Sequence, residues 1–139
     1  MSALESLIRL HRWQLDERRR QLAELDTLGD KLRHEQTRLA AEEQQEQTVA
    51  SSSHEVAPAY GPYARKLIER RDRLKESLTS VEEQIVQARE ALAETYREVK
   101  RYEIASANRM TQQKKRLARQ QQRTLDELGI ENYRRRGSA

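Results

Sequence analysis

Cysteine and phenylalanine are absent from this chain, and only two prolines and four glycines occur among its 139 residues. Without cysteine, the chain can form neither a disulfide framework nor a thiolate metal site. Hydrophobic residues make up only 35% of the sequence, which suits a helix with a thin apolar seam better than a globular core. No segment is long and apolar enough to span a bilayer, and no signal peptide is recognisable, so we expect a cytoplasmic protein.

The patterns that accompany catalysis are also missing. The four glycines are isolated, so there is no glycine-rich phosphate loop. The three histidines, His11, His34 and His54, lack metal-ligand spacing. Neighbouring carboxylates such as Glu42 and Glu43 are typical of a solvated helix face. We therefore expect no catalytic residue, no cofactor, no metal and no small-molecule substrate.

Apolar residues recur at alternating spacings of three and four along two segments, which predicts two helices that bury a narrow stripe. The first seam comprises Leu4, Ile8, His11, Leu15, Arg18, Leu22, Leu25, Gly29, Leu32, Gln36 and Leu39. The second comprises Leu67, Arg71, Leu74, Leu78, Val81, Ile85, Ala88, Leu92, Thr95, Val99 and Tyr102. Polar residues in a seam lower stability but can fix the register of the two helices.

These seams predict an all-α fold, a long antiparallel two-helix coiled-coil hairpin that forms a single rod. The expected segments are a helix over about 3–47, a loop over about 48–62, a helix over about 63–128 and a frayed tail over 129–139. Ser2 is the predicted N-cap of the first helix, Pro62 the first residue of the second, and Gly129 the residue just past its end. A parallel dimer of long helices remains open as an alternative.

The second predicted helix is longer than the first, so its C-terminal part should overhang beyond about residue 108. The heptad pattern also shifts here, because Tyr102, Ser106 and Met110 are spaced four and four. Residues 109–139 carry nine basic and three acidic side chains, a net charge of +6 that exceeds the +4 of the whole chain. We interpret residues 109–128 as a segment that binds an acidic protein. A solvated face and a nucleic-acid contact are the alternatives, and the scarcity of aromatic residues disfavours nucleic acid.

Two further features are candidate contacts. Tyr60, Tyr63, Leu67 and Ile68 form one face at the start of the second helix, either as a staple that closes the hairpin or as an exposed docking patch. Trp13 falls outside the seam of the first helix. It is either a contact anchor or a residue that packs on the overhang.

Several segments resemble the FliJ family of flagellar export proteins. They are LIRL at 7–10, QLDERRR at 14–20, YGPY at 60–63, RRDRL at 70–74 and QRTLDEL at 122–128. The resemblance implies an antiparallel two-helix coiled coil like the central stalk of rotary ATPases. It implies a cytoplasmic component of the type III export apparatus, peripherally associated with the membrane, whose partners are the export ATPase ring, the membrane export gate and export chaperones.

The resemblance assigns a role in gate contact to Tyr63 and Leu67. The residues expected at the ATPase end come from charge and overhang instead: Trp13, Lys114, Lys115, Arg116, Arg119 and Arg123. The alternative function is a coiled-coil regulator or nucleic-acid-associated protein that binds through its basic C-terminal helix.

Overall fold

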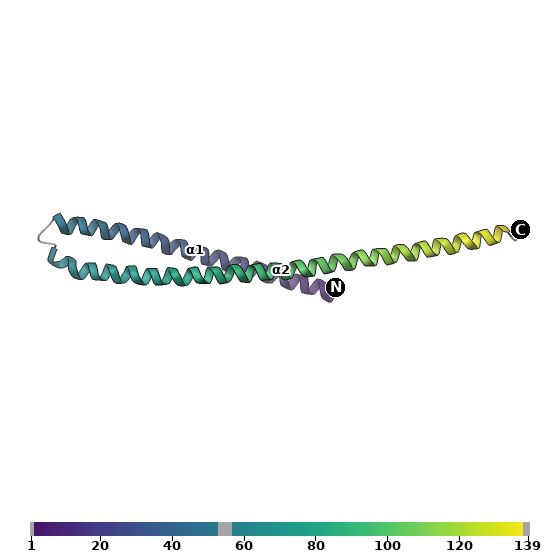
Figure 1. Cartoon of the computed structure of the whole chain (residues 1–139), viewed down its shortest axis with the longest axis horizontal. Coiled ribbons are helices and arrows are strands. Elements are labelled where there is room, and N and C mark those ends of the chain that lie inside the picture. Colours follow the sequence, from purple (N-terminus) through teal and green to yellow (C-terminus); the bar gives the residue numbers. More distant parts are fainter. Residues whose placement is uncertain (1, 53–56, 138–139) are drawn as a thin grey trace. The chain divides into compact units, whose positions relative to one another are not determined.

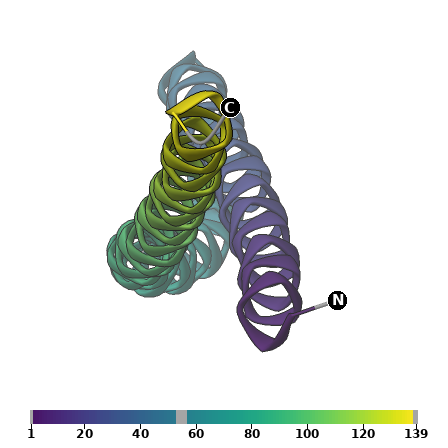
Figure 2. The ribbon, with the colours of Figure 1, turned by 90° about the vertical axis from the view of Figure 1, so that its right-hand side faces the viewer.

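A computed structural model describes residues 2–52 and 57–137, which form two helices (Figure 1). Helix α1 spans Ala3–Ser52 and helix α2 spans Ala57–Gly137. The two helices pack against each other with opposite directions, and the described residues contain no strand. Both helices are continuous when viewed nearly end-on (Figure 2). The all-α antiparallel hairpin predicted from the two seams is therefore confirmed.

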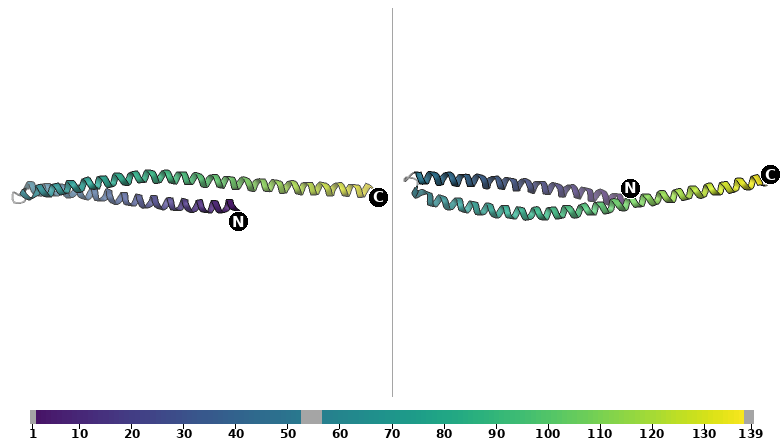
Figure 3. Two further views of the ribbon diagram at one scale, coloured as in Figure 1. Left: turned by 90° about the horizontal axis from the view of Figure 1, so that it is seen from below. Right: turned by 45° about the horizontal axis from the view of Figure 1, so that its top comes forward.

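Residues 13–95 form one compact unit, in which α1 lies beside the first half of α2 (Figures 1 and 3). Its buried core consists of seam residues from both helices: Leu15, Leu39, Leu67, Val81 and Ile85. Gly29 is also buried in this seam, close to Ile85 on the facing helix. Burial at heptad spacing shows that the apolar seams hold this unit together.

Residues 1–12 and 96–139 form the second unit. Here the first turns of α1 cover α2, and Ile8 and Val99 are buried, Val99 to 2% exposure. Ser106 is the last partly covered residue of α2, and every residue from 107 to 137 is exposed. The predicted overhang is therefore confirmed, and we call residues 107–137 the overhang (Figure 3).

Polar residues in the seams behave in two ways. Arg18 and Arg71 are exposed although the heptad places them in the seam, because a long side chain can carry its charge out to water. Thr95 stays buried at 8% exposure, and its hydroxyl donates a hydrogen bond of 2.9 Å to the carbonyl of Ala91. A buried hydroxyl with a partner avoids the cost of an unsatisfied polar group.

Helix α1 begins where the sequence predicts but ends later. The Glu5 amide donates a 3.2 Å hydrogen bond to Ser2 Oγ, which confirms Ser2 as the N-cap. The predicted end near residue 47 is wrong, since α1 continues to Ser52. The hydroxyls of Ser51 and Ser52 donate to carbonyls three residues earlier, at 2.9 and 3.0 Å, so these residues satisfy the last turn instead of breaking it.

Helix α2 is longer than predicted at both ends. It begins at Ala57, so Pro62 lies inside the helix and is not its first residue. Pro62 is still near the N-terminus, where its missing N–H removes a single backbone hydrogen bond. At the other end, the helix runs through Gly129 to Gly137, and no described glycine has positive φ. The predicted helix end at Gly129 and the frayed tail over 129–137 are therefore wrong.

The predicted loop over 48–62 is wrong for residues 48–52 and 57–62, which are helical. Its centre, residues 53–56, and the last two residues of the predicted tail lie outside the described part of the chain. That the whole chain acts as one rod stays a prediction.

Candidate protein-interaction surfaces

The overhang carries a run of positive charge that no acidic residue neutralises. Between Glu103 and Asp126 the sequence contains no acidic side chain. The same stretch contains six cations: Arg109, Lys114, Lys115, Arg116, Arg119 and Arg123. Each is exposed, and none makes an ion pair or hydrogen bond with any residue that the structure describes. Their charge is therefore available to a partner.

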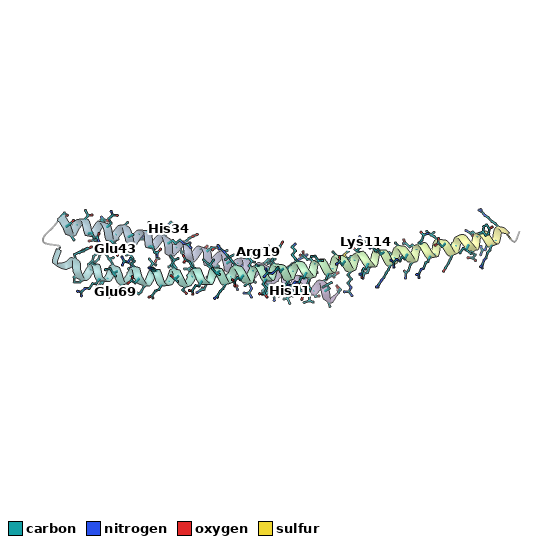
Figure 4. The ribbon with its side chains drawn as sticks, viewed as in Figure 1. His11, Arg19, His34, Glu43, Glu69 and Lys114 are labelled. Carbon is teal, nitrogen blue, oxygen red and sulfur yellow. The ribbon has the colours of Figure 1, made fainter. Side chains whose placement is uncertain are left out.

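Four of these cations share one face of the helix. Arg109, Arg116 and Arg123 recur every seven residues, which is close to two turns, and Arg119 lies beside them. We call these four residues the arginine stripe. Lys115 lies four residues before Arg119, at the edge of this stripe, whereas Lys114 projects from another face. Figure 4 marks Lys114 where α2 has no neighbouring helix. The sequence analysis missed Arg109, although its heptad spacing to Arg116 and Arg123 could have revealed it.

A second stripe on the overhang is apolar. Met110, Leu117, Leu125 and Leu128 are 57%, 56%, 62% and 51% exposed, and we call them the apolar stripe. With about 100° of rotation per residue, this stripe lies about a quarter of a turn from Arg109 and Arg116 and about a third of a turn or more from Arg119 and Arg123. The overhang therefore offers two chemically different faces.

A cluster of polar contacts joins α1 to α2 just before the overhang begins. The ring of His11, which is labelled in Figure 4, stacks on Tyr102 with centroids 4.8 Å apart. Its Nδ1 lies 3.5 Å from Glu98 Oε2. Arg12 Nε and Nη2 donate hydrogen bonds of 3.2 and 3.1 Å to Glu103 Oε1. These hydrogen bonds, together with one from Lys100, hold the pKa of Glu103 below its usual value. The cluster joins the start of α1 to α2.

The four candidate residues at the start of α2, Tyr60, Tyr63, Leu67 and Ile68, which we call the tip patch, are not all exposed. Leu67 is 4% exposed and belongs to the seam, whereas Ile68, its neighbour, is 44% exposed. Tyr60 and Tyr63 are half-buried, and the Tyr63 hydroxyl donates a 2.8 Å hydrogen bond to Glu42 Oε1 on α1. This bond raises the pKa of Tyr63, because it is lost when the phenol ionises. The contacts support the role of a staple at the tip and leave Ile68 as its exposed apolar side chain.

A family model described as "Flagellar FliJ protein" matches residues 1–138, almost the whole chain. The chain belongs to the FliJ family. It is thus a coiled-coil protein associated with flagellar export. No curated protein and no solved structure matches it.

Two other features of this FliJ-family chain bear on function. Trp13 is 61% exposed, which suits a contact anchor. Neither described helix has a stretch apolar enough to cross a membrane, and the described residues hold no cluster of acidic, histidine or cysteine side chains suited to a metal ion. The surfaces that stand out are therefore the two stripes of the overhang, Trp13 and the tip.

Proposed function

We propose that the protein is a non-catalytic, stalk-like component of the flagellar type III export apparatus. In this proposal its overhang binds the export ATPase ring and promotes assembly and ATP hydrolysis, while the tip around Ile68 engages the membrane export gate. Export chaperones are further partners. The protein acts in the cytoplasm, at the membrane-bound apparatus.

The observation that carries this proposal is the unneutralised arginine stripe on a helix with no neighbour. Arginine forms bidentate hydrogen bonds with carboxylates, so the stripe suits an acidic protein surface. Each exposed ion pair contributes only about 0.2–1 kcal/mol, so several pairs together give a contact that forms and exchanges readily. Such a contact suits a stalk that moves against a ring. Lys114 and Lys115 extend the contact surface on the overhang, and Trp13 is a further proposed ATPase contact on the other unit.

Nucleic acid is the competing ligand of the basic helix, in a coiled-coil regulator of another kind. Proteins that bind single strands usually stack bases on aromatic side chains. The overhang has one aromatic residue, Tyr133, and it lies ten residues beyond the last arginine of the stripe. Carboxylates therefore explain the surface better than bases and phosphates do.

The test is ATP hydrolysis by the cognate export ATPase in the presence of four versions of the protein. These are the full chain, a chain that ends at residue 108, the variant Arg116→Gln/Arg119→Gln/Arg123→Gln, and a control. The control, Arg89→Gln/Arg97→Gln/Arg101→Gln, removes the same charge from exposed positions of α2 outside the overhang.

We expect the full chain and the control to stimulate hydrolysis, and the truncated chain to have no effect. The stripe variant should need at least about tenfold more protein for half-maximal stimulation, from three lost pairs at about 0.5 kcal/mol each. Equal stimulation by the truncated chain would move the contact to the paired helices. Absence of stimulation and binding, together with salt-dependent retention on nucleic acid, would favour the competing function.

A further inference from the structure

The seam face of α2, which α1 covers as far as Ser106, continues beyond that residue. In the unit formed by residues 1–12 and 96–139, a shallow groove lined by Glu5, Ile8 and Ser106 marks the last contact of α1 with α2. Beyond Ser106 the same helix is uncovered up to Gly137. The pairing of the two described helices therefore ends at Ser106.

The apolar stripe lies on the same line as the covered seam. Val99 and Leu117 are 18 residues apart, and so are Met110 and Leu128, which is five full turns of an α-helix. Val99 is 2% exposed because α1 covers it, whereas Leu117 is 56% exposed. The heptad shift at Ser106 and Met110 makes Val99 and Met110 eleven residues apart, which is about three turns of the helix. The residues before and after the shift therefore stay on one face of a straight helix. The face that binds α1 is thus continuous with a face that no other described segment covers.

We propose that the apolar stripe is the docking site for an acidic amphipathic helix of a partner protein. This helix would lie along α2 where α1 stops, with its apolar residues against Met110, Leu117 and Leu128. The partner is defined by its chemistry, namely leucine-type residues at heptad spacing flanked by aspartate or glutamate.

The charge of the proposed docking helix is inferred from the ion pairs that already join α1 and α2. Each of these pairs sets a cation on one helix against a carboxylate on the other: Arg12 with Glu103, Arg33 with Glu82 and Arg71 with Glu43. Around the apolar stripe the chain supplies only cations up to Asp126, and Lys114 lies next to the stripe itself. The docking helix must therefore bring the carboxylates. A second copy of this stretch in parallel would bring cations against cations.

This docking site is distinct from the arginine stripe, and Lys114 at its edge is shared with the surface proposed for the ATPase. Arg119 and Arg123 lie about a third of a turn or more around the helix from the apolar stripe, so they stay open when a helix covers it. The inference rests on the uncovered seam and holds whichever protein contacts the arginines.

The experiment uses full-length protein and a fluorescently labelled synthetic peptide of three heptads, with leucine at a and d and glutamate at e and g. Repulsion between the glutamates keeps such a peptide from pairing with itself. Two control peptides are needed. One has every leucine replaced by glutamine at unchanged charge, and the other has every glutamate replaced by lysine. Binding is measured by fluorescence anisotropy.

We expect saturable binding of the acidic leucine peptide, and binding at least tenfold weaker for both controls. The variant Leu117→Gln/Leu128→Gln should weaken binding at least tenfold, whereas Leu7→Gln/Leu10→Gln, at exposed positions of α1, should not. Arg116→Gln/Arg119→Gln/Arg123→Gln should retain most of the binding, which separates this site from the ATPase contact. Circular dichroism checks that every variant keeps its helix content.

Three results would overturn the inference. The first is no saturable binding of the acidic leucine peptide, and the second is equal binding by the glutamine control, which would mean attraction by charge alone. The third is a dimer, seen in sedimentation of the protein by itself, that Leu117→Gln/Leu128→Gln abolishes. In that case the stripe is covered by a second copy of this chain.

Discussion

The paired helices of residues 13–95 and the single helix of residues 107–137 both carry apolar residues along one face. These residues are buried in the first region and exposed in the second. In the paired unit, seam residues such as Leu39 and Val81 are 5% and 6% exposed. In the overhang, Leu117 and Leu128 are 56% and 51% exposed at equivalent spacings. A heptad therefore specifies a face that can be covered, and the reach of the other helix decides whether the chain covers it.

The two regions also differ in how they balance charge. In the paired unit, Arg33 and Arg71 each lie within 4 Å of a carboxylate on the other helix, at 3.7 and 3.9 Å. In the overhang, the arginine stripe has no such partner among the described residues. The paired unit forms ion pairs between its two helices, whereas the overhang presents apolar and positive groups that no other described residue of the chain complements.

The largest expected contrast comes from shortening one leucine in each region. Leu39→Ala should lower the free energy of unfolding by about 2–4 kcal/mol, because it leaves a cavity in the seam. Leu117→Ala should change it by less than about 0.5 kcal/mol, because Leu117 is exposed. Urea unfolding followed by circular dichroism measures both. Similar losses for the two variants would mean that the overhang is part of the folded core.

Replacing one glycine by alanine in each region should give a smaller contrast, in which the paired unit gains stability instead of losing it. A Cβ at Gly29 would lie 3.6 Å from Ile85 Cδ1 and 3.4 Å from Arg33 Nη1, the end of a flexible side chain. Gly29→Ala should therefore stabilise the protein by about 0.5–1 kcal/mol through helix propensity. Gly129→Ala, with open space around it, should raise helix content without moving the unfolding midpoint. A destabilising Gly29→Ala would show that the seam is too tight for a methyl group.

The smallest effect concerns the contacts at the border of the two regions. The hydrogen bonds from Arg12 and Lys100 lower the pKa of Glu103 below its usual value of 4.5. Their stabilisation is thus present above that value and is lost as the pH falls through the lowered pKa. Glu103→Gln should lower the unfolding midpoint slightly at neutral pH and reduce its decline in acid. An unchanged acid response would assign the decline to other carboxylates.

Much of the fold could be predicted from the sequence because heptad spacing is a local property. The two seams, the Ser2 cap and the overhang past residue 106 agree with the structure. The helix ends could not be predicted as well. Ser51 and Ser52 use their hydroxyls to satisfy backbone carbonyls, and Gly129 continues the helix although glycine often ends one.

The candidate surfaces were predicted in part. Charge counting located the basic segment, yet it grouped Lys114 with the arginines although Lys114 projects from another face. The tip patch grouped Leu67 with Ile68, and the structure buries the first and exposes the second. Both differences arise because sequence distance does not state the direction of a side chain around the helix. The roles of these residues in binding stay predictions.

The sequence by itself determined that the chain is helical, that each helix has one apolar face, and that positive charge collects near the C-terminus. These properties depend on residue type and spacing alone. Only the tertiary structure decided which part of each apolar face is covered. Val99 is buried and Leu117 is not, although they lie on one line of α2, because α1 begins at Ala3 and reaches no further than Ser106.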